Sequence, residues 1–240
     1  TEPPDAPEEA VEEIKKRRMA LRGPEQLSHD LLTELTTPHI ASPDLHVDSQ
    51  HQVIVMYFHG LDGLGQQVTR MATSNDGIRF SAQPGILGSS YLRAFHHAGY
   101  TFAMVMPGRM LRSKDGLPPF EEGALLFNKN MRHAALLEKE GALYVFWSQV
   151  GDTPERILMS TIELSADWQT WKETEATEIL RPERTWEGAD APLEPSVRST
   201  AYGHVNQLRD PAIFEEGGHV YLLYSVAGES GIAIAEVEMS

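Results

Sequence analysis

Residues 197–228 read VRSTAYGHVNQLRDPAIFEEGGHVYLLYSVAG. The first half of this stretch is dense in polar side chains. The second half, from His219 to Val226, has the pattern of a β-strand and follows a Glu-Glu-Gly-Gly turn. Buried polar groups without partners cost about 1–3 kcal/mol each, so such a run forms either a paired structural network or a site. We interpret it as a site next to a strand.

Similar strand-like runs that end in glycine recur upstream. They cover residues 53–60, 101–108 and 142–151, and the run at 219–228 is the fourth. The first three are roughly 40 to 50 residues apart, which is the spacing of propeller blades. Few helical patterns follow residue 35, and short strands at even spacing indicate an all-β fold.

A second repeat follows the strands. Residues 74–80 read SNDGIRF and residues 113–120 read SKDGLPPF, while residues 160–171 take the same place in the third unit with a longer turn. Asp-Gly supplies the positive φ that a tight turn needs. Each unit therefore predicts strand, turn, strand, turn, strand, which is one blade of a β-propeller.

Residues 172–208 are rich in Pro, Glu and Arg and have little strand pattern. A segment this long without secondary structure is usually functional or disordered, and we expect an excursion over one face. Four repeats are visible. The expected count is five blades, with the fifth built from residues 27–42 and the C-terminus or contained in the excursion.

The N-terminal part differs in pattern. Residues 8–22, EEAVEEIKKRRMALR, predict a helix in which acidic residues precede basic ones, as the helix dipole favours. We expect residues 1–26 to form a tail and a surface helix, and residues 27–240 to form the propeller domain. The chain begins at Thr1 rather than Met, which suggests processing and favours a periplasmic or secreted location.

Composition excludes several classes of protein. The net charge of −15 argues against nucleic acid as a partner, because nucleic-acid binders present basic patches. No apolar run approaches the length of a membrane span. The chain has no cysteine, which removes disulfides, thiolate metal sites and cysteine nucleophiles. Composition leaves the oligomeric state open.

These motifs together resemble the five-bladed β-propeller glycosidase superfamily that contains glycoside hydrolase family 43, as a divergent branch. The resemblance is carried by residues 74–80, by residues 209–214 leading into 221–224, and by Trp186-Glu187-Gly188, which is similar to the Glu-Gly-Pro element of the family's general acid. It covers residues 43–240 and implies an axial pocket in which the first residues of the blades meet.

Two positions depart from the family's pattern. The family carries its base on an early Asp-Pro element, whereas this chain has Ser42-Pro43-Asp44. The family's middle-blade Asp is replaced by Arg132 and His133. We predict three catalytic residues, which are Asp44, Glu187 and Asp210. A glycosidase needs two carboxyl groups that flank the bond, one to give a proton and one to activate water or attack.

The predicted substrate-binding residues are basic for so acidic a chain. They are His46, Arg93, Arg132, His133, Glu194, Arg198, Tyr202, His204 and Arg209. Arginine forks bind carboxylates and sulfates in a bidentate manner, so we expect an anionic glycan that carries uronate or sulfate. Each residue also has a structural explanation, such as a turn position for Asp44 or a local pair between Arg132 and Glu138.

Two other functions fit the same residues. In a polysaccharide lyase, arginine would neutralise a uronate while Tyr202, His133 or His204 moved protons. In a binding propeller, glycan or partner recognition would persist without catalysis. No cofactor is required. We predict no protein metal centre, because His96 and His97 are adjacent on a strand and face opposite ways. A calcium ion in the channel is compatible with the fold.

Overall fold

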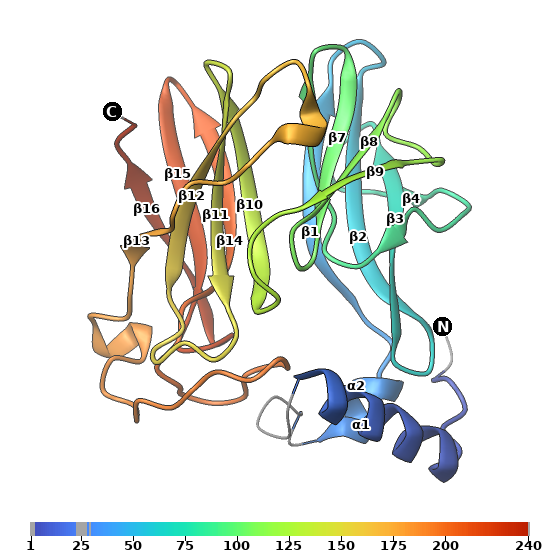
Figure 1. Ribbon diagram of the computed structural model, residues 1–240, viewed down its shortest axis with the longest axis vertical. Helices are drawn as coiled ribbons and strands as arrows, with labels where there is room; N and C mark the ends of the chain where they lie inside the picture. Colours follow the sequence, from blue (N-terminus) through green and yellow to red (C-terminus); the bar gives the residue numbers. More distant parts are fainter. Residues whose placement is uncertain (1–2, 23–27, 29, 240) are drawn as a thin grey trace.

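The computed structural model of the chain describes residues 3–22, 28 and 30–239 (Figure 1). Its strands form four antiparallel sheets in chain order, and each sheet is one blade of a β-propeller. Two helices, α1 (Glu8–Arg22) and α2 (Leu31–Thr36), precede the first strand. The predicted all-β propeller with an N-terminal helix is confirmed. The five-bladed count is not confirmed, because the described residues form four sheets.

The strands of each blade follow one another in sequence. Blade 1 contains β1 (Ile40–Asp48), β2 (Val53–Gly63), β3 (Gln66–Ser74), β4 (Ser81–Ala82) and β5 (Gly88–Ser89). Blade 2 contains β6 (Arg93–His97), β7 (Tyr100–Val105), β8 (Arg109–Ser113) and β9 (Glu121–Leu125). Blade 3 contains β10 (Met131–Lys139), β11 (Ala142–Gln149), β12 (Ile157–Glu163) and β13 (Thr177–Leu180). Blade 4 contains β14 (Arg209–Glu216), β15 (His219–Val226) and β16 (Gly231–Val237).

The four strands predicted from sequence are the second strands of the blades. They are β2, β7, β11 and β15, and each is hydrogen-bonded to a strand on both sides. Most of their residues are buried or half-buried on both faces. Their apolar pattern follows from this position, since a strand in the middle of a blade is covered more fully than the strands at its edges.

Three of the four innermost strands share a β-bulge near their first residue. The register shifts between Ala41 and Asp44 in β1, between Met131 and Ala134 in β10, and between Arg209 and Ala212 in β14. A bulge re-aims side chains and often lies next to a functional site. The polar residues predicted at the starts of blades 1, 3 and 4 therefore lie at or next to the same kind of β-bulge.

The start of blade 4 differs from the expectation for residues 209–214. We expected a polar loop that leads into the strand at residue 219, but residues 209–216 are themselves the innermost strand β14. Pro211 lies within the bulge, and β14 pairs only with β15. A proline is tolerated there because an edge strand has one side without ladder hydrogen bonds.

The two Asp-Gly turns have the same geometry. The Ser74 hydroxyl oxygen accepts from the Gly77 N–H at 2.9 Å, and the Ser113 hydroxyl oxygen accepts from the Gly116 N–H at 2.8 Å. Both glycines have positive φ, of 71° and 79°. The repeated sequence therefore marks one type of turn, which follows the third strand of blades 1 and 2.

Apolar side chains fill the spaces between neighbouring blades. One cluster joins blades 1 and 2 around Tyr57 and Ala103. A second joins blades 2 and 3 around Phe102 and Trp147, and includes Trp168 from the turn after β12. A third joins blades 3 and 4. Within the described part of the chain, no such cluster joins blade 4 to blade 1.

The first and last blades expose apolar side chains on their outer faces. In blade 4 these are Phe214, Ile232 and Ile234, and in blade 1 they are Ile40, Leu45 and Val47. Cross-strand register places Ile234 opposite Leu223, and Leu223 opposite Ala212, so three strands contribute to one face of blade 4.

The N-terminal helices pack beside blade 1 (Figure 1). Helix α1 covers the residues predicted to be helical. Leu35 of α2 is fully buried, and its carbonyl accepts from the Gly65 N–H in the β2–β3 turn at 2.9 Å. The predicted domain boundary after residue 26 lies outside the described residues. Residues 31–36 are helical, so residues 27–42 do not supply a fifth blade. No helix among the described residues could span a membrane.

Replacing one isoleucine on β12 tests the packing between blades. Ile162 is 0% exposed, whereas Ile232 of β16 is 77% exposed. Ile162→Ala should lower the free energy of unfolding by about 2–5 kcal/mol, because it removes buried methyl groups and leaves a cavity. Ile232→Ala, the matched control, should stay within about 0.5 kcal/mol. Urea unfolding measures both. Equal losses in the two variants would contradict the described packing.

Candidate functional site

Buried arginines at the starts of innermost strands link neighbouring blades. Arg93 begins β6, and its Nε donates to the Ala134 carbonyl of blade 3 at 2.8 Å. Its Nη1 donates to the Ser42 carbonyl of blade 1, also at 2.8 Å. A buried cation needs such partners, and these hydrogen bonds of Arg93 link blade 2 to blades 1 and 3.

Arg132 of β10 and Arg209 of β14 share one carboxylate, that of Glu155. Glu155 Oε2 lies 3.6 Å from Arg132 Nη1 and 3.3 Å from Arg209 Nε, while its Oε1 accepts from the Ser148 hydroxyl at 2.8 Å. All of these side chains are buried. Two guanidinium groups around one buried carboxylate form a strongly coupled cluster that joins blades 3 and 4.

The same two arginines also form hydrogen bonds with backbone carbonyls of the excursion, at residues 197–199. Arg132 Nη1 donates to the Val197 carbonyl at 3.0 Å, and Arg209 Nη1 donates to the Ser199 carbonyl at 2.8 Å. The Ser199 hydroxyl donates to the hydroxyl of Ser28, at 2.9 Å. Residues 197–199 are therefore tied to the blade starts by their backbone.

Asp44 lies at the junction of blades 1 and 2. Its Oδ2 is 2.8 Å from Nε2 of His46 and accepts from the Ala94 N–H at 2.7 Å. Burial acts to raise the pKa of Asp44, but the hydrogen bond and charge of His46, the charge of Arg93 and the Ala94 N–H outweigh it. The pKa of Asp44 therefore lies below its ordinary value, and its carboxylate is ionised and paired.

His133 and Asp210 meet between blades 3 and 4. Nδ1 of His133 lies 3.2 Å from Oδ1 of Asp210, and Nε2 of His133 accepts from Nε of Arg132 at 3.2 Å. The imidazole accepts from Arg132 and lies beside the Asp210 N–H, 3.4 Å from Nδ1, so the ring is not doubly protonated. Burial, followed by the charges of Arg132 and Arg209, lowers the pKa of His133 well below its ordinary value, which keeps the ring neutral.

The carboxyl group of Asp210 has the opposite shift. Burial raises its pKa to about 6, and the charges of Glu229 and Glu155 add to this, while Arg132 and Arg209 oppose it. The side chain still keeps 31% of its surface exposed. Its backbone has a φ of 47°, in the left-handed region that L-residues rarely adopt. Raised pKa, solvent access and an unusual backbone angle coincide at this residue, as they often do at functional sites.

A column of aromatic rings crosses the centre of the propeller. The ring centroid of Tyr91 lies 4.3 Å from that of His59 and 5.1 Å from that of His133. Burial and then the charge of Asp210 raise the pKa of Tyr91. Burial and then the charge of His39 lower the pKa of His59 to about 4. Blades 1 and 3 are therefore joined through neutral rings beside Asp210.

Glu187 has a different environment. Its Oε2 accepts from the N–H groups of Glu183 and Arg184, both at 2.9 Å, and its Oε1 accepts from the Tyr224 hydroxyl at 3.1 Å. The carboxylate closes the short helical turn Thr185–Glu187 and is buried. These contacts explain Glu187 as a capping residue, and its predicted catalytic role stays a prediction.

The remaining predicted residues lie on the excursion. Tyr202, His204 and Glu194 are exposed. Nε2 of His204 is 2.7 Å from Oδ1 of Asp190. Arg198 is half-buried, and its Nη2 donates to the Lys129 carbonyl at 3.1 Å. The structure thus brings seven predicted residues together at the blade starts, namely Asp44, His46, Arg93, Arg132, His133, Arg209 and Asp210.

Three residues of this cluster were not predicted, namely His59, Glu155 and Glu229. Glu229 lies in the β15–β16 turn, and its Oε1 accepts from Arg209 Nη1 at 3.1 Å and from the Ala201 N–H at 3.2 Å. None of these residues belongs to a repeated motif. The sequence does predict Tyr91, as an aromatic ring placed to stack on a sugar, and it lies two residues before β6.

Metal binding has little support in this cluster. No group of three or more His, Cys, Asp or Glu side chains in the described ranges is arranged to hold a metal ion. The carboxylates of Glu155 and Glu229 face guanidinium groups instead. Arginine guanidinium groups thus contact one oxygen of each of these carboxylates, and the calcium ion in the channel stays a prediction.

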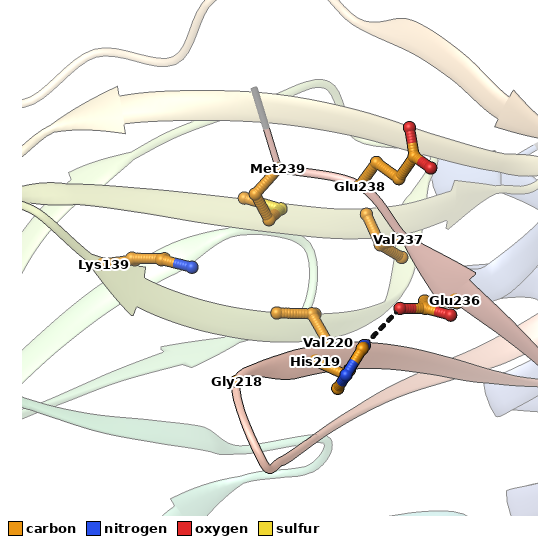
Figure 2. Close-up of a pocket in the computed structure, with 8 residues that line it drawn as sticks. All are labelled: Lys139, Gly218, His219, Val220, Glu236, Val237, Glu238 and Met239. Atoms are coloured by element: carbon orange, nitrogen blue, oxygen red, sulfur yellow. Dashed lines mark hydrogen bonds and ion pairs between the residues drawn. The ribbon is translucent and has the colours of Figure 1, made fainter.

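A pocket of about 260 Å³ lies at the other ends of blades 3 and 4 (Figure 2). Its lining includes Lys139 at the end of β10, His219 at the start of β15 and Glu236 near the end of β16. His219 pairs there with Glu236. None of the predicted site residues lines this pocket.

Comparison with known proteins supports the fold. No protein-family model matches the chain. An uncharacterised protein of Acanthamoeba polyphaga mimivirus is 38% identical in an alignment of 221 residues that covers 84% of this chain and 62% of that protein. The chain therefore spans less than two thirds of the length of this relative.

Several solved glycoside hydrolases have a similar structure. A thermostable family-43 glycoside hydrolase gives a TM-score of 0.59 at 14% identity, with 84% of this chain and 70% of that chain covered. The α-L-arabinanase of Cellvibrio cellulosa, complexed with arabinohexaose, gives 0.58 at 11% identity, covering 84% and 75%. A β-xylosidase/α-arabinofuranosidase from a compost metagenome, complexed with xylotriose, gives 0.57 at 15%, covering 84% and 71%. The TM-scores show a shared fold, and at such low sequence identity the similarity extends to the fold alone.

Neutralising Glu155 tests the arginine cluster. Glu155→Gln keeps the shape and the Ser148 contact but leaves two buried guanidinium groups without their shared charge. The free energy of unfolding should fall by about 3–5 kcal/mol. Glu163→Gln, at an exposed position on β12, is the matched control and should change little. Urea unfolding of both variants measures this, and a loss below about 1 kcal/mol would rule out the coupling.

Asp210 should make stability depend on pH. Its folded pKa of about 6 lies above the ordinary 3.8, so the folded state holds a proton that the unfolded state releases. Its contribution to stability is therefore present at low pH and is lost as pH rises through about 6. Asp210→Asn should gain about 1–2 kcal/mol over the wild type between about pH 4 and pH 7. Thermal unfolding across this range, with exposed Asp5→Asn as control, tests it. A constant difference would contradict the raised pKa.

Proposed function

We propose that the chain is a propeller glycoside hydrolase in which Asp210 donates the proton to the leaving group. The observation that carries the proposal is the raised pKa of Asp210, to about 6, at a partly exposed carboxyl group. A general acid must keep its proton near the working pH, and burial raises the pKa of Asp210 toward that range. The similar fold of known glycoside hydrolases supports the class of reaction.

Glu229 is our candidate for the second carboxyl group. Its Oε1 accepts hydrogen bonds from Arg209 Nη1 and from the Ala201 N–H. Glu229 also contributes to the raised pKa of Asp210, so their charges interact. A glycosidase needs two carboxyl groups near the bond, and Glu229 is the carboxylate whose charge acts on Asp210 from the neighbouring turn.

The other predicted catalytic residues fit less directly. Asp44 is ionised and paired with His46, which suits a stabilising role beside the reacting sugar. Glu187 uses both oxygens within its own turn and for Tyr224. We therefore assign proton donation to Asp210, and keep Asp44 and Glu187 as further candidates for the same reaction.

The charge of the substrate is a separate part of the proposal. Arg93, Arg132 and Arg209 are buried and donate to carbonyl groups or face carboxylates. Arg132 and Arg209 face Glu155 and Asp210, Arg209 also pairs with Glu229, and the charge of Arg93 acts on Asp44. This arrangement favours a neutral sugar at the axial cluster over the uronate or sulfate expected from the count of arginines.

Removing the acid should abolish turnover. Arabinohexaose, xylotriose and β-1,3-galactotriose, the ligands of similar structures, serve as substrates. Asp210→Asn should lower the rate by about 10²–10⁴-fold while binding persists. In the wild type, the rate should fall as pH rises through about 6, because the protonated acid is lost. Asp5→Asn is the control.

Release of reducing ends measures this reaction. Ultraviolet absorbance of an unsaturated product would indicate the lyase alternative instead, and binding without either product would indicate a binding propeller. Unchanged turnover in Asp210→Asn would remove Asp210 from the mechanism.

A further inference from the structure

Two aromatic side chains of the excursion face solvent. The chain has four tryptophans, of which Trp147, Trp168 and Trp171 are buried. Trp186 is 56% exposed, and Tyr202 on the same excursion is 75% exposed. Neither ring serves the core. Large exposed aromatic surface usually marks a place where another molecule binds.

The segments that carry these rings are tied together. His204 pairs with Asp190 at 2.7 Å, and the Asn206 side-chain amide donates to the carbonyls of Ala189 and Ala191 at 3.3 and 3.1 Å. A Cβ added to Gly188 would lie only 2.1 Å from the Val205 carbonyl oxygen, so the two backbones are in close contact. Residues 185–191 and 202–206 therefore form one surface unit.

This unit is anchored on both sides. Glu187, next to Trp186, is buried and bonded to Tyr224 of β15. Ala201, next to Tyr202, donates its N–H to Glu229, which in turn binds Arg209. The Ser230 hydroxyl donates to the Gly203 carbonyl at 3.0 Å. Trp186 and Tyr202 are thus held at fixed places on a backbone continuous with the axial cluster, and little ordering cost accompanies binding.

We propose that Trp186 and Tyr202 form a stacking platform for neutral sugar rings of an oligosaccharide that extends outward from the axial cluster. The inference rests on the proposed hydrolase function and adds that the substrate is an oligomer rather than a single sugar. The C–H faces of a sugar ring are apolar and pack on aromatic faces. The half-exposed pair of His204 and Asp190, on the same two segments as the rings, offers polar atoms to sugar hydroxyls.

The surrounding charge favours a neutral sugar over nucleic acid, whose bases also stack on aromatic rings. The chain carries a net charge of −15, and the exposed residues Asp190, Glu183 and Glu194 lie on the same excursion. Phosphates would meet repulsion there. A neutral oligosaccharide meets none, so it is the ligand that fits both the rings and the charge.

The single exposed tryptophan makes the platform measurable. Acrylamide quenching of the fluorescence reports mainly on Trp186, because the other three are buried. Arabinohexaose, xylotriose and β-1,3-galactotriose are titrated into the full chain at concentrations up to several millimolar. At least one should protect Trp186 from quenching. Tyr202→Ala should weaken that protection by about tenfold, as expected for the loss of one stacked ring.

Calorimetry with Trp186→Ala should show a similar loss of affinity for the same oligosaccharide. Tyr221→Ala on blade 4 is the matched control and should leave the affinity unchanged. Protection without sugar that grows with protein concentration would show that a second copy covers the rings, and equal protection by an oligonucleotide would show a nucleic-acid surface. Either result overturns the platform, as does the absence of protection by all three sugars.

The two proposals fail separately. Protection that depends on Tyr202, with no release of reducing ends, keeps the platform and removes the hydrolysis. Release of reducing ends with unchanged quenching of Trp186 keeps the hydrolysis and removes the platform.

Discussion

The shared pairing of Arg132 and Arg209 with buried Glu155 is the interaction on which the rest of the site depends. It joins blades 3 and 4, and the same arginines hold residues 197–199 by their carbonyl groups. The charges of Arg132 and Arg209 also act to lower the pKa values of Asp210 and His133. One buried carboxylate thus links the packing of two blades, the path of the excursion and the protonation of the candidate acid.

The pKa of Asp210 results from the opposing effects of burial and of neighbouring charges. Burial and the charges of Glu229 and Glu155 favour the protonated form of Asp210, while Arg132 and Arg209 favour the ionised form. Burial is the largest effect, so the balance lies toward a neutral acid. Holding Asp210 in a left-handed backbone conformation costs free energy, and the packing of the surrounding strands offsets this cost.

Sequence patterns predicted the strands that lie between two others, such as β2 and β11, because burial on both faces leaves a strong apolar signal. They also predicted α1 and the turn at residues 74–80. Strand β14 was missed because its first residues are polar and include Pro211. The blade-start residues were found by repeat position. Glu155 and Glu229 were not, because their partners lie 20 or more residues away in the chain, and a single sequence carries no mark of such pairs.

The apolar outer faces of blades 1 and 4 have a mechanical consequence. Packing clusters in the described structure join blade 1 to 2, 2 to 3 and 3 to 4, so the array has two ends. In such an array each unit is stabilised by its neighbours, and an end unit has one neighbour where an inner unit has two. Amide hydrogens of β15 and β16 should then exchange with solvent by opening of blade 4 alone, whereas those of β7 and β11 require a larger part of the propeller to come apart.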